Sequence, residues 1–242
     1  MRDRPPGRDR FPATRWSLVV AAGRDSSPGS DRALAELCDA YWYPVYAYLR
    51  RSGQDAEDSA DLTQGFFAEL LEKRYWQQAD RERGRFRSFI LIALRGFLSR
   101  RFERGAAQKR GGGAAPLSLD VADAEGRYRH EPASDSTPER IYERRWALTV
   151  LGHALRRLRQ RYEADGRSEL FEQLKPSLTG DAAGRPYSEL AEDLGMTESA
   201  VKVAVHRLRR RYRDAIGQEI MQTVTDSSDI DAELASLRAA LI

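Results

Sequence analysis

The hydrophobic residues of this chain recur mostly at intervals of three and four, which is the spacing of one face of an α-helix. No stretch alternates between apolar and polar residues for long enough to predict a β-strand, and no internal repeat is present. We therefore expect an all-α fold. The helices are expected over residues 14–22, from Ser30 or Asp31 to about Gly53 with a kink at Pro44, and over residues 55–74, 85–104, 137–162, 168–174 and 187–213.

The segments between these helices divide the chain into parts. We expect a disordered leader (1–13), a first helical domain (14–110), an acidic flexible linker (111–136), a second helical domain (137–217) and an acidic C-terminal extension (218–242). Thr137, Pro138 and Glu139 are typical of a helix start, because they supply a capping side chain, a proline for the first turn and an acid after it. The C-terminal extension has hydrophobic residues spaced for one more amphipathic helix.

Residues 187–213 have the pattern of a helix-turn-helix. Ala191, Gly195 and Val201 stand where such a motif has a small residue, a left-handed turn and an aliphatic residue that locks the two helices together. The second helix is apolar on one side and basic on the other, which favours docking in the DNA major groove. A helical hairpin with a solvated charged face is the simpler alternative.

Charge adds a second candidate surface. The net charge of the 242 residues is only +3, but the charges between Asp55 and Glu72 are all acidic, whereas the helix over 85–104 is rich in arginine. Its arginines lie among phenylalanines, and aromatic rings beside cations are what single-stranded bases need. We favour the simpler interpretation for the phenylalanines, which places them in the core, and expect the basic face to bind nucleic acid.

Composition excludes several kinds of site. Cys38 is the only cysteine, so neither an internal disulfide nor a cysteine-based zinc site can form, and we expect a buried thiol. The histidines are scattered, and no phosphate-binding glycine loop or nucleophile motif is present. The apolar run from Trp16 to Ala22 is too short to span a membrane. We expect a cytoplasmic protein that is not an enzyme and uses neither cofactor nor metal ion.

Three motifs, in order, resemble the extracytoplasmic-function (ECF) group of bacterial sigma-70 family transcription factors. DSADLTQGFF, from Asp58 to Phe67, resembles the signature D-x-x-D-L-x-Q-x-x-F of this group. GRFRSFILIALRGFLSRRFER resembles its next helix, and YSELAEDLGMTESAVKVAVHRLRRRYR resembles its promoter-binding helix-turn-helix. The resemblance covers most of the chain outside the leader, the linker and the C-terminal extension.

The resemblance implies a region 2-like first domain and a region 4-like second domain, joined by a linker that threads toward the polymerase active-centre channel. The implied partners are promoter DNA and core RNA polymerase, through its clamp helices and flap, with an anti-sigma factor or another regulator as a further candidate. The implied polymerase contacts are Asp61, Gln64 and Glu69. The implied contacts to the −10 promoter element are Arg85, Arg87, Arg95, Arg100, Arg101 and Arg104. The implied contacts to the −35 element are Glu198, Ser199, Lys202, Val203, His206, Arg207 and Arg210.

The chain departs from the family pattern at four positions. Ala60 and Gly65 stand where acids are usual, and Phe89 and Gly96 stand where the next helix usually has tryptophan and asparagine. These departures concern the details of polymerase contact and the choice of base at the −10 element. They leave the class of protein that the three motifs imply unchanged.

Two other functions are open alternatives. A helix-turn-helix regulator that binds DNA without polymerase accounts for residues 187–213 but gives the acidic helix no task. A nuclease would use Glu57, Asp58 and Asp61 to hold Mg²⁺, but no second carboxylate helix with histidine support is evident. The C-terminal extension would either shield basic surfaces, dock a regulator, or form an additional packed helix.

Overall fold

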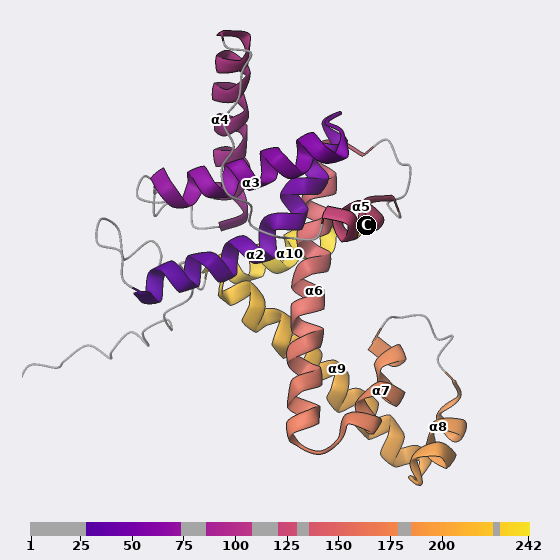
Figure 1. Cartoon of the computed structure of the whole chain (residues 1–242). Helices are drawn as coiled ribbons and strands as arrows, with labels where there is room; N and C mark the ends of the chain where they lie inside the picture. Colours follow the sequence, from indigo (N-terminus) through magenta and orange to yellow (C-terminus); the bar gives the residue numbers. More distant parts are fainter. Residues whose placement is uncertain (1–27, 74–85, 108–120, 130–135, 179–184, 225–227) are drawn as a thin grey trace, which may run out of the picture. The chain divides into compact units, whose positions relative to one another are not determined.

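The computed structural model describes residues 28–73, 86–107, 121–129, 136–178, 185–224 and 228–242 (Figure 1). These residues form helices without a β-strand among them, so the expected all-α class is confirmed for this part of the chain. The elements are α2 (Pro28–Arg51), α3 (Ala56–Lys73), α4 (Phe86–Ala107), α5 (Val121–Arg129), α6 (Pro138–Ala164), α7 (Ser168–Leu174), the 3-10 helix η3 (Lys175–Leu178), α8 (Tyr187–Leu194), α9 (Glu198–Met221) and α10 (Ser228–Ala239). The expected leader and the helix over 14–22 lie outside the described residues.

The chain forms two compact units. The first comprises residues 1–149 and 221–242, and the second comprises residues 150–220. The boundaries fall inside α6 and at the end of α9, whereas the sequence indicated domain ends near 110, 137 and 217. The C-terminal extension therefore belongs to the first unit.

Side-chain caps explain where three of the helices begin. The side-chain oxygens of Asp55, Thr137 and Thr197 each accept a hydrogen bond from the backbone N–H three residues later, at 2.8, 3.3 and 3.2 Å. Such caps satisfy amides that have no partner within the helix and are worth about 1 kcal/mol each. The helix α2 continues through Pro44 as one element, and Cys38 within it is buried as expected.

Aromatic side chains form much of the core of the first unit. Tyr41 on α2 lies edge-to-face with Phe86 on α4, with 4.9 Å between the ring centroids, and 6.4 Å from the ring of Tyr142 on α6. Phe66 on α3 and Phe97 on α4 make a second edge contact at 5.8 Å. Phe86 and Phe97 are buried, which confirms the core interpretation for these two phenylalanines. Because buried aromatic pairs add specific ring geometry to the hydrophobic effect, they fix α4 against α2 and α3.

Part of the expected flexible linker is a docked helix. Helix α5 packs on α2, where the Glu125 carboxylate accepts hydrogen bonds from the Tyr46 hydroxyl at 2.8 Å and from Arg50 Nε at 3.0 Å. The guanidinium of Arg127 lies 3.8 Å from the centroid of the Tyr43 ring. The expectation of flexibility is therefore wrong for residues 121–129, because α2 supplies partners for their charges. Residues 111–120 and 130–135 lie outside the described part.

The C-terminal extension packs against the beginning of α4. The backbone N–H of Phe86 donates to the carbonyl of Thr223 at 3.0 Å. Val224, Glu233 and Leu237 are buried in the same unit. The expected additional helix is present as α10, and one of its acidic residues is inside the protein rather than at its surface.

The second unit has its own hydrophobic core, to which four helices contribute. Leu158 comes from α6, Phe171 from α7, Leu190 from α8, and Val205 and Leu208 come from α9. All five side chains are at most 3% exposed. This core holds the two helices of the helix-turn-helix in place.

Candidate nucleic-acid interface

A left-handed glycine turn joins α8 to α9. Gly195 has φ 60° and ψ 32°, a conformation that a residue without a Cβ adopts at the lowest cost. The N–H of Met196 donates to the carbonyl of Ala191 at 2.9 Å, which closes the end of α8. Ala191 and Val201 are both buried in the core of this unit. The structure therefore has the two helices and the glycine turn that the sequence predicts.

The side of α9 that faces away from the core is polar and exposed. Val201, Val205 and Leu208 point into the core. The seven positions that we expected to face DNA are all exposed, namely Glu198, Ser199, Lys202, Val203, His206, Arg207 and Arg210. Within this unit, the structure leaves the whole predicted contact face accessible.

One cation of this face already has an anionic neighbour. The Lys202 Nζ atom lies 2.7 Å from Glu198 Oε1, one helical turn away. This hydrogen bond and the charge of Glu198 raise the pKa of Lys202. Both side chains are exposed, and exposed ion pairs are weak. A DNA phosphate can therefore replace Glu198 as the partner of Lys202 at little cost.

Two other arginines of α9 hold the second unit together. Arg209 donates to the carbonyl of Ser177 from Nε at 3.0 Å and from Nη2 at 2.9 Å. Arg211 lies over the ring of Tyr162, 5.4 Å from its centroid. A count of basic residues in the sequence therefore overstates how many of them are available to DNA.

The arginines of α4 have different environments. Arg101 is exposed, and Arg95 is exposed but forms an ion pair with Glu139 at 2.7 Å. Arg100 is half-buried and lies 3.2 Å from Glu69. Arg85 and the side chain of Arg104 lie outside the described part. In Figure 1 the C-terminal part of α4 projects beyond α3.

Arg87 is buried, which contradicts its expected role as a −10 contact. Its side chain is 8% exposed, and it donates to the completely buried Glu233 at 3.1 and 2.8 Å. It also donates to Glu143 on α6, and its guanidinium lies 4.6 Å from the centroid of the Trp146 ring. Burial works to lower the pKa of Arg87, but the hydrogen bonds to Glu233 and Glu143 outweigh it and raise the pKa. Arg87 connects α4, α6 and α10 and does not form part of a DNA surface.

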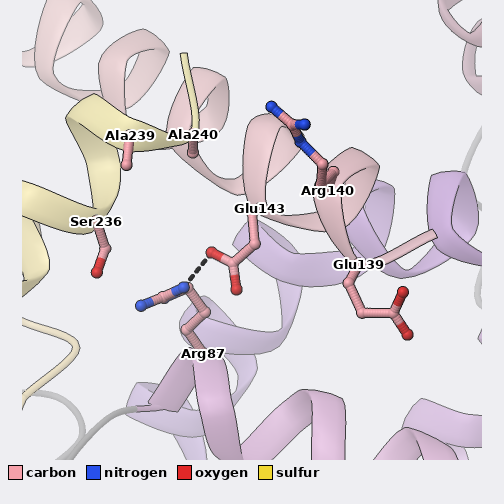
Figure 2. Close-up of a pocket in the computed structure, with 7 residues that line it drawn as sticks. All are labelled: Arg87, Glu139, Arg140, Glu143, Ser236, Ala239 and Ala240. Carbon is pink, nitrogen blue, oxygen red and sulfur yellow. Dashed lines mark hydrogen bonds and ion pairs between the residues drawn. The ribbon is translucent and has the colours of Figure 1, made fainter. Parts of the chain in front are cut away.

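An open pocket of about 320 Å³ adjoins this cluster. Figure 2 shows Arg87 and Glu143 pointing toward one another, with Ser236 and Ala239 of α10 beside them. Burial raises the pKa of Glu143 above its ordinary value, although Arg87 works in the opposite direction. The sequence offered one signal of this cluster, because Glu233 interrupts the apolar stripe of α10.

The acidic helix α3 presents part of its charge to solvent. Asp61 is exposed, Gln64 is half-buried, and Glu69 is half-buried and bridges Lys73 at 3.1 Å and Arg100. A Cβ at Gly65 would lie 3.3 Å from Arg101 Nη1 and 3.6 Å from Phe97 Cζ, so a side chain at this position would require the end of Arg101 to shift slightly. Gly65 therefore lies where α3 and α4 approach one another, next to a cation of α4.

Neither a metal site nor a membrane-spanning helix accompanies these surfaces in the described part of the chain. Among the described residues, no three His, Cys, Asp or Glu side chains are grouped closely enough to hold a metal ion, so the nuclease alternative gains no support. None of the helices in that same part is long and apolar enough to cross a membrane. No family model, curated protein or solved structure matches the chain.

Proposed function

We propose that the chain is an RNA polymerase sigma factor of the ECF type, which directs core polymerase to promoters and assists their opening. The observation that supports this most specifically is the acidic side of α3, at the start of the DSADLTQGFF motif and just before it. Glu57, Asp58 and Asp61 are exposed there, whereas Phe66 and Phe67 on the same helix are buried. Negative charge repels DNA, so a cluster of exposed carboxylates suits a protein partner with a basic surface better than it suits DNA.

In this proposal the two units have different tasks. The exposed face of α9 reads the −35 element in the major groove, and Asp61 and Gln64 contact the clamp helices of core polymerase. On α4, Arg95 and Arg101 are exposed and suited to the −10 element, and Arg87 is left out because it is buried. Arg95 would exchange its exposed partner Glu139 for a phosphate. Such an exchange is feasible, because a surface ion pair contributes little.

Binding to core RNA polymerase tests this proposal directly. We expect the full chain to co-elute with core polymerase. The double variant Asp61→Ala with Gln64→Ala should weaken this binding about tenfold or more, because the few residues that dominate an interface each cost more than about 1 kcal/mol when truncated and about 1.4 kcal/mol is a tenfold loss. A matched control is Glu192→Gln, which removes an exposed carboxylate of α8 outside the motif. Failure of the unmodified chain to bind core polymerase would remove the proposal.

A helix-turn-helix regulator that acts without polymerase is the second candidate. The exposed basic face of α9 favours it as much as it favours a sigma factor. The two functions differ in what the acidic side of α3 does. Sequence-specific duplex binding by the full chain, without any affinity for core polymerase, would support the regulator.

A further inference from the structure

Val203 is an apolar side chain on an otherwise polar surface. It is the sixth residue of α9 and is 46% exposed. Among the described residues of the second unit, it is the only large hydrophobic residue that is exposed. Its neighbours one helical turn away on the same face are Ser199, His206 and Arg207, all exposed.

The stability of α9 does not account for a valine at this position. A β-branched side chain loses rotamer freedom in a helix, so valine is a weaker helix former than alanine, lysine or arginine. Val203 is 46% exposed, so it gains much less from burial than Val201 and Val205, which lie on the opposite side of α9 and are at most 2% exposed. The same branching has one useful consequence: in a helix, valine adopts a single rotamer and presents its methyl groups in a fixed direction.

The basic residues around Val203 indicate which kind of molecule its side chain contacts. Lys202, His206 and Arg207 would bring the helix against the phosphates and bases of a duplex. In the major groove, thymine is the one base with an apolar group, its C5-methyl, and apolar side chains are what recognise that group. A polar group placed against this methyl would gain no hydrogen bond, whereas an aliphatic group packs on it favourably.

We propose that Val203 selects a thymine in the target sequence by packing against its C5-methyl group. This inference rests on the part of the proposed function in which α9 reads duplex DNA. Beyond that function, the inference names the base that Val203 contacts and the chemical group that the contact recognises. Uracil lacks the C5-methyl group, and burying one such group is worth about 0.8 kcal/mol. This energy predicts about a fourfold preference for thymine over uracil.

Uracil substitution tests the contact, because uracil differs from thymine only by this methyl group. Duplexes are first selected from a synthetic random library, with the full chain alone and with the full chain bound to core polymerase. Each thymine of the best duplex is then replaced by uracil, one at a time, and the affinity is measured. Synthetic DNA contains no 5-methylcytosine, so thymine is the only source of a C5-methyl group. We expect one replacement to weaken binding about fourfold.

Variants assign this effect to Val203. In Val203→Ala the same replacement should have almost no effect, and in Val203→Ile the effect should return. Both variants should fold, because the side chain is exposed and alanine is the better helix former. Leu148→Ala, which changes an exposed apolar residue of α6, should leave the uracil effect unchanged.

The outcomes separate this inference from the proposed function. An uracil effect that persists in Val203→Ala, or no uracil effect in the unmodified chain, would overturn the inference even if polymerase binds. A Val203-dependent effect in the chain alone, without polymerase binding, would support the inference and remove the sigma-factor proposal. Selection of no duplex under either condition would overturn both.

Discussion

Replacing Glu233 with glutamine should destabilise the first unit strongly. Glu233 has no exposed surface and accepts two hydrogen bonds from Arg87. Glutamine keeps the size of the side chain and one acceptor but removes the charge, so Arg87 loses one charge-assisted hydrogen bond and part of its compensation. Breaking a buried ion pair from one side costs about 3–5 kcal/mol. Because Glu143 also binds Arg87, we expect about 3 kcal/mol, at the lower end of that range.

Urea denaturation followed by tryptophan fluorescence measures this unit selectively. All four tryptophans lie between residues 1 and 149, so their signal does not report the second unit. With a denaturant slope of about 2 kcal/mol per molar urea, the expected loss lowers the midpoint by about 1.5 M. Far-UV circular dichroism of the same samples reports both units, and the transition of the second unit should stay where it is.

A chemically matched control distinguishes burial from the mere loss of a carboxylate. Glu36→Gln makes the same change in an exposed ion pair, because the side chain of Glu36 is 41% exposed and that of its partner Arg32 is 82% exposed. This variant should lower the free energy of unfolding by less than about 0.5 kcal/mol. Arg87→Met combined with Glu233→Leu should recover part of the stability lost in Glu233→Gln, because neither position then carries a buried charge and Glu143, the other partner of Arg87, is 28% exposed. The reasoning is refuted if Glu233→Gln shifts the midpoint no more than Glu36→Gln does.

Three further predictions concern other parts of the chain. Gly195→Ala should destabilise the second unit by about 1–2 kcal/mol, because φ is 60° at this position, whereas Gly217→Ala within α9 should be neutral or stabilising. Urea denaturation followed by circular dichroism measures the stability of both variants, and equal effects would contradict the turn argument. Burial works to raise the pKa of Glu125, but the hydrogen bonds that Glu125 accepts outweigh burial and lower the pKa. The contribution of the Glu125 carboxylate to stability is therefore present above about pH 4.3 and is lost as the pH falls through the lowered pKa. The stability difference between the unmodified chain and Glu125→Gln should therefore shrink between about pH 5 and pH 3, and a constant difference would contradict this origin. Arg207→Ala should weaken binding to the selected duplex about tenfold and reduce its salt dependence, and an unchanged salt dependence would remove Arg207 from the contact face.

Local features of the sequence predicted the helices and the turn well. The starts at Asp55 and Thr137 depend on side chains within one turn, and Gly195 provides a left-handed residue by its own chemistry. The exposed face of α9 follows from helical periodicity once Val201 is placed in the core. These predictions need no information about distant parts of the chain.

Features that depend on distant contacts were not predictable in this way. Arg87 was expected on a basic surface, but its partner Glu233 lies 146 positions further along the chain. Helix α5 was expected to be flexible, but Glu125 meets Tyr46, 79 positions before it. The position of Glu233 in the apolar stripe of α10 indicated a buried acid but did not identify its partner, and charge composition does not show which charges are buried together.

Run-off transcription is the most direct test of the central claim that this chain is a sigma factor. Core RNA polymerase is incubated with the full chain and a library of random promoter templates, and the transcripts are sequenced. We expect transcripts from a subset of templates that share two separated sequence elements. With the Arg207→Ala variant, transcription should depend less on the sequence of the upstream element. Transcription no greater than that of core polymerase alone, with a chain that still binds duplex DNA, would contradict the claim and favour a regulator that acts without polymerase.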